Sequence, residues 1–265
     1  MTAIALTIAG SDSGGGAGIQ ADLKAFSALG VYGASVITAV TAQTTVGVTA
    51  VHEVPAVVVG AQIAAVLDDL SVNAIKLGML FSPAIIDQVA GHLQSFGGPV
   101  VLDPVMIAKS GDALLQDEAA EALISDVLPL STLLTPNLPE AARLLGVEPA
   151  GTVAEMAEQG RSLLAMGPKA VLMKGGHGSG EILTDVLVSP HYLVELTAPR
   201  METRNTHGTG CTLSSAIAAG LATGLDTEHA VRMGHAYLQK AIKAADTLEI
   251  GSGHGPVHHF TGLWV

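Results

Sequence analysis

Short aliphatic runs alternate with helix-period segments along almost the whole chain, and this alternation is the feature that most restricts the fold. Residues 3–9 form the first aliphatic run, a glycine-rich turn follows, and residues 19–29 carry a helical pattern that ends at Gly30. Alternating β and α elements favour one parallel, doubly wound sheet with right-handed crossovers. We therefore expect an α/β fold with a mostly parallel central sheet and helices on both faces.

The rest of the chain continues this pattern without an internal repeat. Further strands are predicted at residues 36–42, 74–77, 99–103, 132–135, 170–174, 185–188 and 192–196, and helices near residues 59–70, from 82, at 209–222 and at 227–248. Hydrophobic residues make up 49% of the chain but aromatic residues only 3%, a composition typical of helices packed on a buried parallel sheet. No linker-like stretch interrupts the 265 residues, so we expect a single domain spanning 1–265.

The charge balance limits the range of partners. The net charge of -12 argues against nucleic acid and anionic membranes as partners, although a few cations and backbone N–H groups can still form a local site for ATP. Residues 30–51 and 205–225 lack charged side chains, but both contain Gly and many polar residues, which indicates buried elements and no membrane span. A lone cysteine and the absence of an export signal predict a cytoplasmic protein.

Residues 205–212 (NTHGTGCT) lie immediately before an Ala-rich helix. Glycines at 208 and 210 would let the backbone turn its N–H groups inward, and these donors with the helix N-terminus would make an anion hole for a phosphoryl group. A small-residue helix start with a buried cysteine fits the spacing equally well. In the first interpretation the helix N-terminus would lower the pKa of the Cys211 thiol enough to form the thiolate that a base needs.

Residues 10–18 form a second candidate, a loop with four glycines in its last five residues. It matches neither the dinucleotide fingerprint nor the phosphate loop, because the third glycine of the first and the Gly-Lys-Ser or Gly-Lys-Thr of the second are missing. We expect a flexible loop that lets a flat ligand approach the backbone, with Asp22 one turn into the following helix. A simple strand-to-helix turn is the alternative.

Carboxylates, amides and lysines follow several predicted strands. Asp103 ends one strand with Lys109 six residues on, and Lys174 ends another before two glycines. Asn137 and Glu140 fall one helical turn apart, and oxygen ligands of this kind suit Mg²⁺ held partly through water beside nucleotide phosphates. Each of these motifs alone is also explained by a helix cap or a surface turn.

Taken together, these segments resemble the ribokinase-like superfamily, and within it the hydroxymethylpyrimidine and phosphomethylpyrimidine kinases of thiamin biosynthesis. The resemblance covers nearly the whole chain and is carried by residues 10–22, 41–44, 76–79, 103–112, 135–140, 174–177, 207–212 and 253–260. It implies an ATP-dependent kinase that phosphorylates 4-amino-5-hydroxymethyl-2-methylpyrimidine and then its monophosphate.

The resemblance also implies roles for individual residues. Cys211 lies beside the substrate hydroxymethyl group, where most superfamily members have Asp, and Gly208, Thr209 and Gly210 supply the anion hole. Gln43 hydrogen-bonds the aminopyrimidine edge, and the remaining residues expected to line the substrate pocket are Gly10, Ala17, Asp22, Met79 and Val105. A side-chain amide offers the donor and acceptor that match a ring nitrogen beside an exocyclic amine.

For the nucleotide, the resemblance implies Mg²⁺ and ATP across the C-terminal edge of the sheet. Asn137 and Glu140 act on the metal or its water, Lys174 and Thr209 contact the phosphates, and Lys109 is the candidate cation for the bound monoester. A homodimer is expected. Two alternatives are a pyridoxal or pyridoxine kinase, which would act on a similar hydroxymethyl group, and a non-catalytic pyrimidine sensor.

Overall fold

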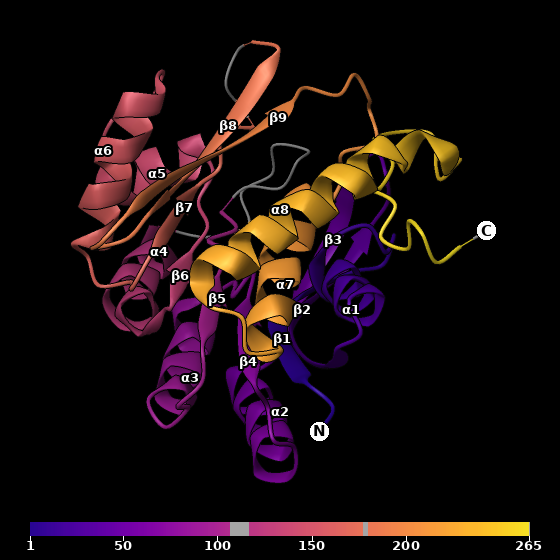
Figure 1. Ribbon diagram of the computed structural model, residues 1–265. Coiled ribbons are helices and arrows are strands. Elements are labelled where there is room, and N and C mark those ends of the chain that lie inside the picture. Colours follow the sequence, from indigo (N-terminus) through magenta and orange to yellow (C-terminus); the bar gives the residue numbers. More distant parts are fainter. Residues whose placement is uncertain (107–116, 177–179, 265) are drawn as a thin grey trace.

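The computed structural model describes residues 1–106, 117–176 and 180–264. Within these residues, nine strands form one sheet in the order β3-β2-β1-β4-β5-β6-β7-β8-β9 (Figure 1). β1 (Ile4–Asp12) pairs in parallel with β2 (Tyr32–Gln43) and with β4 (Ala74–Leu77). Parallel pairing continues through three short strands, β5 (Val100–Leu102), β6 (Leu133–Leu134) and β7 (Val171–Met173). The predicted mostly parallel sheet is confirmed.

The outer strands join the sheet by antiparallel pairing. β3 (Val48–Glu53) pairs with β2 at one edge, and β8 (Ile182–Val188) and β9 (Leu193–Pro199) extend the other edge. β3 was not predicted from the sequence, because most of its side chains are exposed and give no aliphatic run. β2 and β8 are also longer than predicted, since their added residues are exposed or only partly buried.

Helices cover both faces of the sheet, as expected (Figure 1). The helices on one face are α1 (Gly18–Ala28), α7 (Thr209–Ala222) and α8 (Thr227–Lys243). The helices on the other are α2 (Ala56–Asp69), α3 (Pro83–Leu93), α4 (Asp117–Ala122), α5 (Leu138–Leu145) and α6 (Val153–Leu164). Among the described residues, no helix has the length and apolar character needed to cross a membrane.

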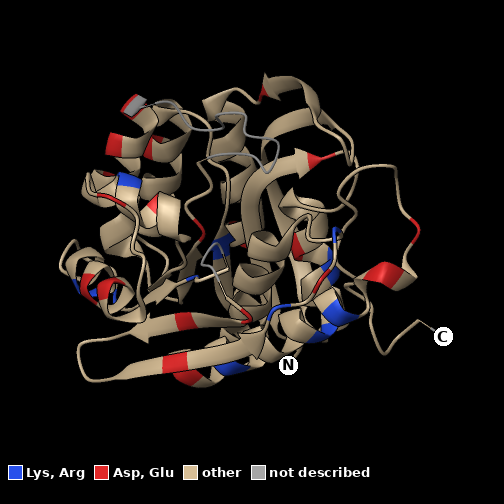
Figure 2. Ribbon diagram, turned by 90° about the horizontal axis from the view of Figure 1, so that it is seen from above, with Lys and Arg blue, Asp and Glu red and all other residues tan. Residues whose placement is uncertain are grey.

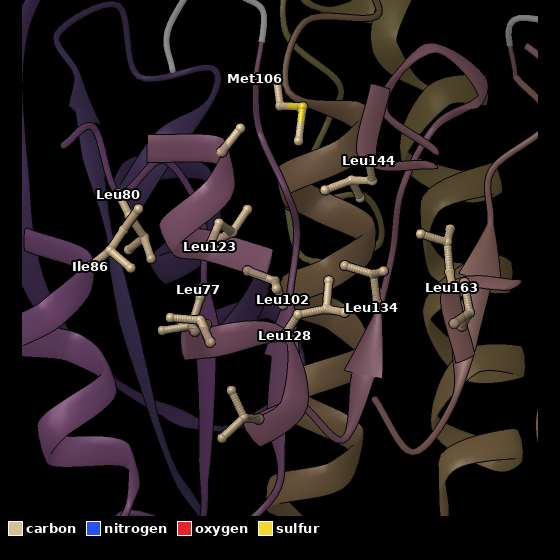
Figure 3. Close-up of a cluster of buried hydrophobic side chains, with 14 of the residues drawn as sticks. Leu77, Leu80, Ile86, Leu102, Met106, Leu123, Leu128, Leu134, Leu144 and Leu163 are labelled. Atoms are coloured by element: carbon tan, nitrogen blue, oxygen red, sulfur yellow. The ribbon is translucent and has the colours of Figure 1, made fainter. Parts of the chain in front are cut away.

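The core consists mainly of aliphatic side chains, as the composition predicts. Leu77, Leu102 and Leu134 come from three neighbouring strands, are fully buried and pack with Ile86 of α3 and Leu128 (Figure 3). Close packing of such side chains leaves little freedom for the strands to shift. The ends of the central strands are therefore held in fixed relative positions.

The strand order creates a crevice next to β1. The chain leaves β1 for β2 on one side and later returns to β4 on the other, so the crossover helices lie on opposite faces at this point. In open α/β sheets, ligands bind outside the carboxyl ends of the strands at such a switch point.

Figure 2 views the molecule from the top of Figure 1 and shows Asp and Glu on several helices and loops, with Lys and Arg between them.

Candidate active site

A pocket of about 900 Å³ lies at the ends of the parallel strands and reaches the N-terminus of α7. The predicted site residues that line it are Gly10, Ala17, Gln43, Met79, Val105, Asn137, Glu140, Lys174, Gly208, Thr209, Gly210 and Cys211. Asp22 is not among the lining residues, because it is fully buried below the pocket. Lys109 lies outside the described residues. One pocket therefore brings together segments that are far apart in the sequence.

The turn before α7 forms part of the pocket wall. Gly208 is the N-cap residue of α7, and its φ of 79° places it in the left-handed region that favours glycine. A Cβ at this position would collide with the backbone carbonyl oxygen of Gly16. The first amides of a helix have no preceding helical carbonyl to bind, so those of Gly210 and Cys211 can bind an anion, assisted by the helix dipole.

A compact charge cluster lies opposite this turn. Lys174 follows β7, and its Nζ lies 2.7 Å from Asp103 Oδ1 at the end of β5 and 3.9 Å from Glu140 Oε2 of α5. Burial alone would lower the pKa of Lys174, but attraction to Asp103 and Glu140 outweighs burial and raises it. The ammonium therefore stays charged. The sequence motif associated Asp103 with Lys109, whereas the structure pairs that carboxylate with Lys174.

Glu140 is an unusual carboxylic acid within this cluster. Burial raises its pKa to about 7, against the attraction of Lys174 and with added repulsion from Asp103. Its carboxylate also accepts the backbone N–H of Asn137 at 2.8 Å, while Asn137 Oδ1 accepts the N–H of Glu140 at 2.9 Å. This capping box starts α5. Asn137 and Glu140 thus have a structural role in addition to their position in the pocket.

The oxygen donors of this cluster fit Mg²⁺ only if water and nucleotide phosphates supply the remaining ligands. No group of three or more His, Cys, Asp or Glu side chains able to hold a metal occurs in residues 1–106, 117–176 and 180–264. Mg²⁺ is commonly held through one or two carboxylates together with water and substrate phosphates. A carboxyl group whose ionised form is destabilised by burial, as in Glu140, would gain from a nearby divalent cation. The residues therefore fit a metal that arrives with a nucleotide.

A second ion pair lies beneath the pocket. Nζ of Lys76 in β4 lies 2.9 and 2.8 Å from the two carboxylate oxygens of Asp22 in α1, and both side chains are fully buried. The same carboxylate accepts hydroxyl bonds from Thr7 and Ser215, each 2.6 Å long. Burial would lower the pKa of Lys76, but Asp22, Cys211 and Asp103 together raise it above its ordinary value. The network joins β1, β4, α1 and α7.

Cys211 lies in the first turn of α7 and lines the pocket. Burial raises the pKa of its thiol to about 11, although Lys76 acts in the opposite direction. The prediction of a lowered thiol pKa was therefore wrong. The helix N-terminus is a local feature of the sequence, whereas the burial that outweighs it and the neighbouring charges of Asp22 and Asp103 arise only in the folded chain.

The glycine loop after β1 is held by its own carboxylate. Asp12 accepts backbone N–H bonds from Gly14 at 2.8 Å, Gly16 at 3.0 Å and Ala17 at 2.8 Å. Its Oδ2 also lies 2.8 Å from Nε2 of His207. Burial opposes ionisation of Asp12, but these bonds and the nearby imidazole lower its pKa below the ordinary value. Residues 10–18 were expected to form a flexible loop, but these hydrogen bonds hold the loop at several points.

Three residues that the structure places at the site had no role predicted from the sequence. Asp12 and His207 line the pocket as a pair although 195 positions separate them, and Lys76 forms its floor. A carboxylate directly before a glycine run can bind the amides of its own turn, so Asp12 had a local signal. His207 and Lys76 had none, because their partners are distant in the sequence.

Comparison with known proteins agrees with this geometry. The family model described as phosphomethylpyrimidine kinase matches residues 12–258. The chain is 60% identical over 264 residues to the hydroxymethylpyrimidine/phosphomethylpyrimidine kinase of Rhizobium meliloti (strain 1021), in a match that covers 100% of this chain and 99% of that protein.

Two solved structures have a similar fold. A phosphomethylpyrimidine kinase from Clostridium difficile 630 matches with a TM-score of 0.80 and 46% identity, over 90% of this chain and 99% of that chain. An ADP complex of Bacillus subtilis pyridoxal kinase matches with a TM-score of 0.90 and 36% identity, over 98% of each chain. The higher sequence identity lies with the pyrimidine kinase.

Replacing Gly208 with alanine tests the turn before α7. The Gly208→Ala variant must place a Cβ in a left-handed conformation and against the carbonyl of Gly16, so we expect a loss of about 2–4 kcal/mol in the free energy of unfolding. Gly224→Ala is the matched control, because Gly224 has a φ of 93° but an added Cβ would meet nothing within 4 Å. It should lose about 1 kcal/mol. Equal losses in urea unfolding would contradict the proposed contact.

Replacing Glu140 with glutamine tests its raised pKa. Because the pKa is about 7 in the folded protein and 4.5 in the reference state, folding favours the protonated acid; the resulting stability is present below pH 4.5 and is lost as pH rises through 7. Glu140→Gln keeps the capping oxygen but does not titrate. We expect the variant to lack a pH-dependent loss on the order of 2–3 kcal/mol between pH 4.5 and 7. If the free energies of unfolding of the wild type and the variant, measured in urea, changed in parallel between pH 4.5 and 7, the raised pKa of Glu140 would be refuted.

Proposed function

The chain belongs to the phosphomethylpyrimidine kinase family, and on this basis we propose that it transfers the γ-phosphoryl group of ATP to 4-amino-5-hydroxymethyl-2-methylpyrimidine and then to the resulting monophosphate. The observation that carries this proposal is the single pocket that joins Gln43, the turn at residues 208–211 and Lys174. A donor and acceptor for a flat ring, an anion-binding turn and a partly buried cation are the groups that such a transfer requires.

Gln43 and the walls beside it support binding of the pyrimidine. The Gln43 amide would pair with the ring nitrogen and its neighbouring exocyclic amine. Met79 and Val105 would cover the ring faces, and a Cβ on Gly10 would collide with the Met79 methyl group. Glycine at position 10 therefore leaves room for the Met79 side chain. Ala17 completes the wall, and Asp22 acts from below through Lys76.

The charge cluster supports binding of the nucleotide phosphates. Lys174, the amides of Gly210 and Cys211 and the side chain of Thr209 would hold the transferring phosphoryl group, and Glu140 with Asn137 would hold Mg²⁺ through water. The metal, when bound, neutralises phosphate charge. Lys174 shares its charge with two carboxylates, so a nucleotide must compete with Asp103 and Glu140 for it.

The two transfers place different demands on the protein. In the first, the acceptor hydroxyl oxygen forms a bond to the γ-phosphorus, the bond to the β–γ bridging oxygen breaks, and ADP leaves. The hydroxyl proton departs late, to an oxygen of the transferred phosphoryl group or to solvent water, because the attacking oxygen gains little charge in a loose transition state. In the second transfer the acceptor is a phosphate oxygen that is already ionised at neutral pH, since its pKa is about 6. Only the first transfer has a hydroxyl proton to release.

The neutral thiol of Cys211 supports a role in placing the hydroxyl group. With a pKa of about 11, a thiolate at neutral pH would cost roughly 5 kcal/mol, too much for a resting base. We therefore assign Cys211 to contact and orientation of the alcohol. Lys109 stays the predicted cation for the monoester phosphate.

Three features of the whole protein remain predictions. A single kinase domain over residues 1–265 is supported by the continuous nine-stranded sheet of the described residues. A cytoplasmic location is supported by the lone cysteine, which permits no intrachain disulfide. The homodimer is expected from the family resemblance alone.

An assay of ADP release tests the proposed function. The protein should release ADP with the hydroxymethylpyrimidine and with its monophosphate, and kcat/KM for pyridoxal should be at least about tenfold lower, because pyridoxal lacks the amine that Gln43 would bind. Turnover with pyridoxal alone would replace the proposal with a pyridoxal kinase. No ADP release with all three compounds would favour a non-catalytic sensor.

Replacing Cys211 with alanine tests its role. Cys211→Ala should lower kcat for the first transfer by about 10- to 100-fold and leave KM for the pyrimidine within a few-fold, while the second transfer should change less than about threefold. Cys211→Ser, which keeps a hydrogen-bonding group, should recover part of the first rate. A wild-type kcat that rises with pH toward 11, with the rise absent from Cys211→Ser, would instead identify the thiolate as a general base.

A further inference from the structure

His207 lies where three parts of the pocket meet. Its imidazole Nε2 is 2.8 Å from Asp12 Oδ2 in the glycine loop and 3.4 Å from Nε2 of Gln43 at the end of β2. It directly precedes Gly208, the N-cap of α7. A side chain in this position can influence the orientation of the pyrimidine-binding amide of Gln43.

Contacts on all sides fix the position of the His207 ring. The backbone N–H of His207 donates to the carbonyl of Gly255 at 3.0 Å, and the backbone forms a parallel bridge with Pro256. The ring packs on Gly16, where a Cβ would collide with it. Its partner Asp12 is itself held by three backbone amides. The imidazole therefore has little freedom to turn away.

The bond to Asp12 decides which group His207 offers to Gln43. An ionised carboxylate only accepts hydrogen bonds, and the low pKa of Asp12 keeps it ionised near neutral pH. His207 Nε2 must therefore carry the proton in this 2.8 Å bond. The same nitrogen then has no lone pair for the N–H of Gln43. Nε2 of His207 can offer Gln43 only the N–H that it already donates to Asp12. The amide atom of Gln43 nearer to His207 should therefore be the oxygen.

The hydrogen bonds of Thr41 independently indicate the same orientation of the Gln43 amide. Its hydroxyl donates its one hydrogen to the carbonyl of Ser11 at 2.8 Å, while the amide atom of Gln43 at 3.3 Å from this hydroxyl is Oε1. Two acceptors would then face each other. Exchanging the positions of Oε1 and Nε2 by a 180° rotation of the Gln43 amide removes both conflicts, because Nε2 donates to Thr41 and Oε1 accepts from His207.

We propose that His207, held by Asp12, is a positioning residue that fixes the Gln43 amide with its oxygen toward His207 Nε2 and its N–H toward Thr41, and thereby sets ligand specificity. The second lone pair of the oxygen and the second amide hydrogen remain for a ligand. A ring edge must then present its amine on the His207 side and its ring nitrogen on the Thr41 side. An edge without the amine leaves the Gln43 oxygen without its second partner.

This inference rests on the proposed binding of an aminopyrimidine at Gln43, and a double-mutant cycle tests it. The probe is 4-amino-5-hydroxymethyl-2-methylpyrimidine, and the readout is its Kd by calorimetry, which needs no turnover. His207→Ala and Gln43→Ala should each weaken binding by about tenfold. The double variant should bind no more than about threefold weaker than Gln43→Ala, because His207 acts through that amide.

Two controls separate positioning from a general structural effect. His207→Gln supplies an amide with two N–H donors and should restore Kd to within about threefold of the wild type. The analogue without the 4-amino group should bind the wild type at least about tenfold more weakly than the probe, and His207→Ala should reduce that preference to about threefold or less. The Kd for ATP should change less than about twofold in each variant.

The outcomes distinguish this inference from the proposed function. Additive losses in the cycle, or an unchanged preference for the amine in His207→Ala, would overturn the positioning role while the wild type still binds the pyrimidine. A wild-type protein that does not bind the pyrimidine would overturn both. If His207→Ala does not fold, the His207→Gln and Thr41→Val variants replace it. The proposed orientation would also be refuted if Thr41→Val bound the pyrimidine with wild-type Kd while His207→Gln bound it tenfold more weakly.

Discussion

The buried ion pair between Asp22 and Lys76 is the interaction on which the site depends. It lies at the pocket floor and, with Thr7 and Ser215, connects β1 and β4 to α1 and α7. Buried ion pairs add little net stability compared with apolar residues, but the loss of one partner leaves an uncompensated charge that typically costs about 3–5 kcal/mol. Such a pair therefore works mainly as a constraint: β4, α1 and the first turns of α7 have one permitted arrangement, and the pocket is built on it.

An acidic chain can bind a highly charged anion because charge is organised locally. The net charge is -12, yet the pocket contains a helix N-terminus, the partly buried Lys174 and the fully buried Lys76 at its floor. The carboxylates beside these lysines keep them ionised and hold their positions. Asp103 and Glu140 also bring two negative charges close together, and the raised pKa of Glu140 relieves their repulsion by protonation. Binding of a cation or an anion beside Glu140 must therefore change the fraction of Glu140 that is protonated.

The sequence was sufficient to predict the central parallel sheet and the helices α1, α2, α3, α7 and α8, because aliphatic periodicity and glycine-rich turns are local signals. Gln43, Ala17, Met79 and Val105 of the pocket were predicted from the family resemblance. It was insufficient where the deciding contact is distant. β3 is an exposed edge strand defined by its pairing with β2, and Lys174, which pairs with Asp103, lies 71 positions from it. The thiol pKa of Cys211 shifted upward because tertiary burial exceeds the effect of its helix. His207 has no pattern of its own, since Asp12 and Gln43 lie 195 and 164 positions from it.

The bridge between His207 and Pro256 links the pocket to a segment that follows every strand of the sheet. Residues 255–257 fix the backbone of His207, and farther along the side chain of Thr212 lies 2.9 Å from His259, whose carbonyl accepts the hydroxyl of Tyr237. In the chain these residues come after all the strands of the sheet and after the helices that cover it. The position of His207 in the pocket therefore depends on a segment that lies outside the layered body of the protein.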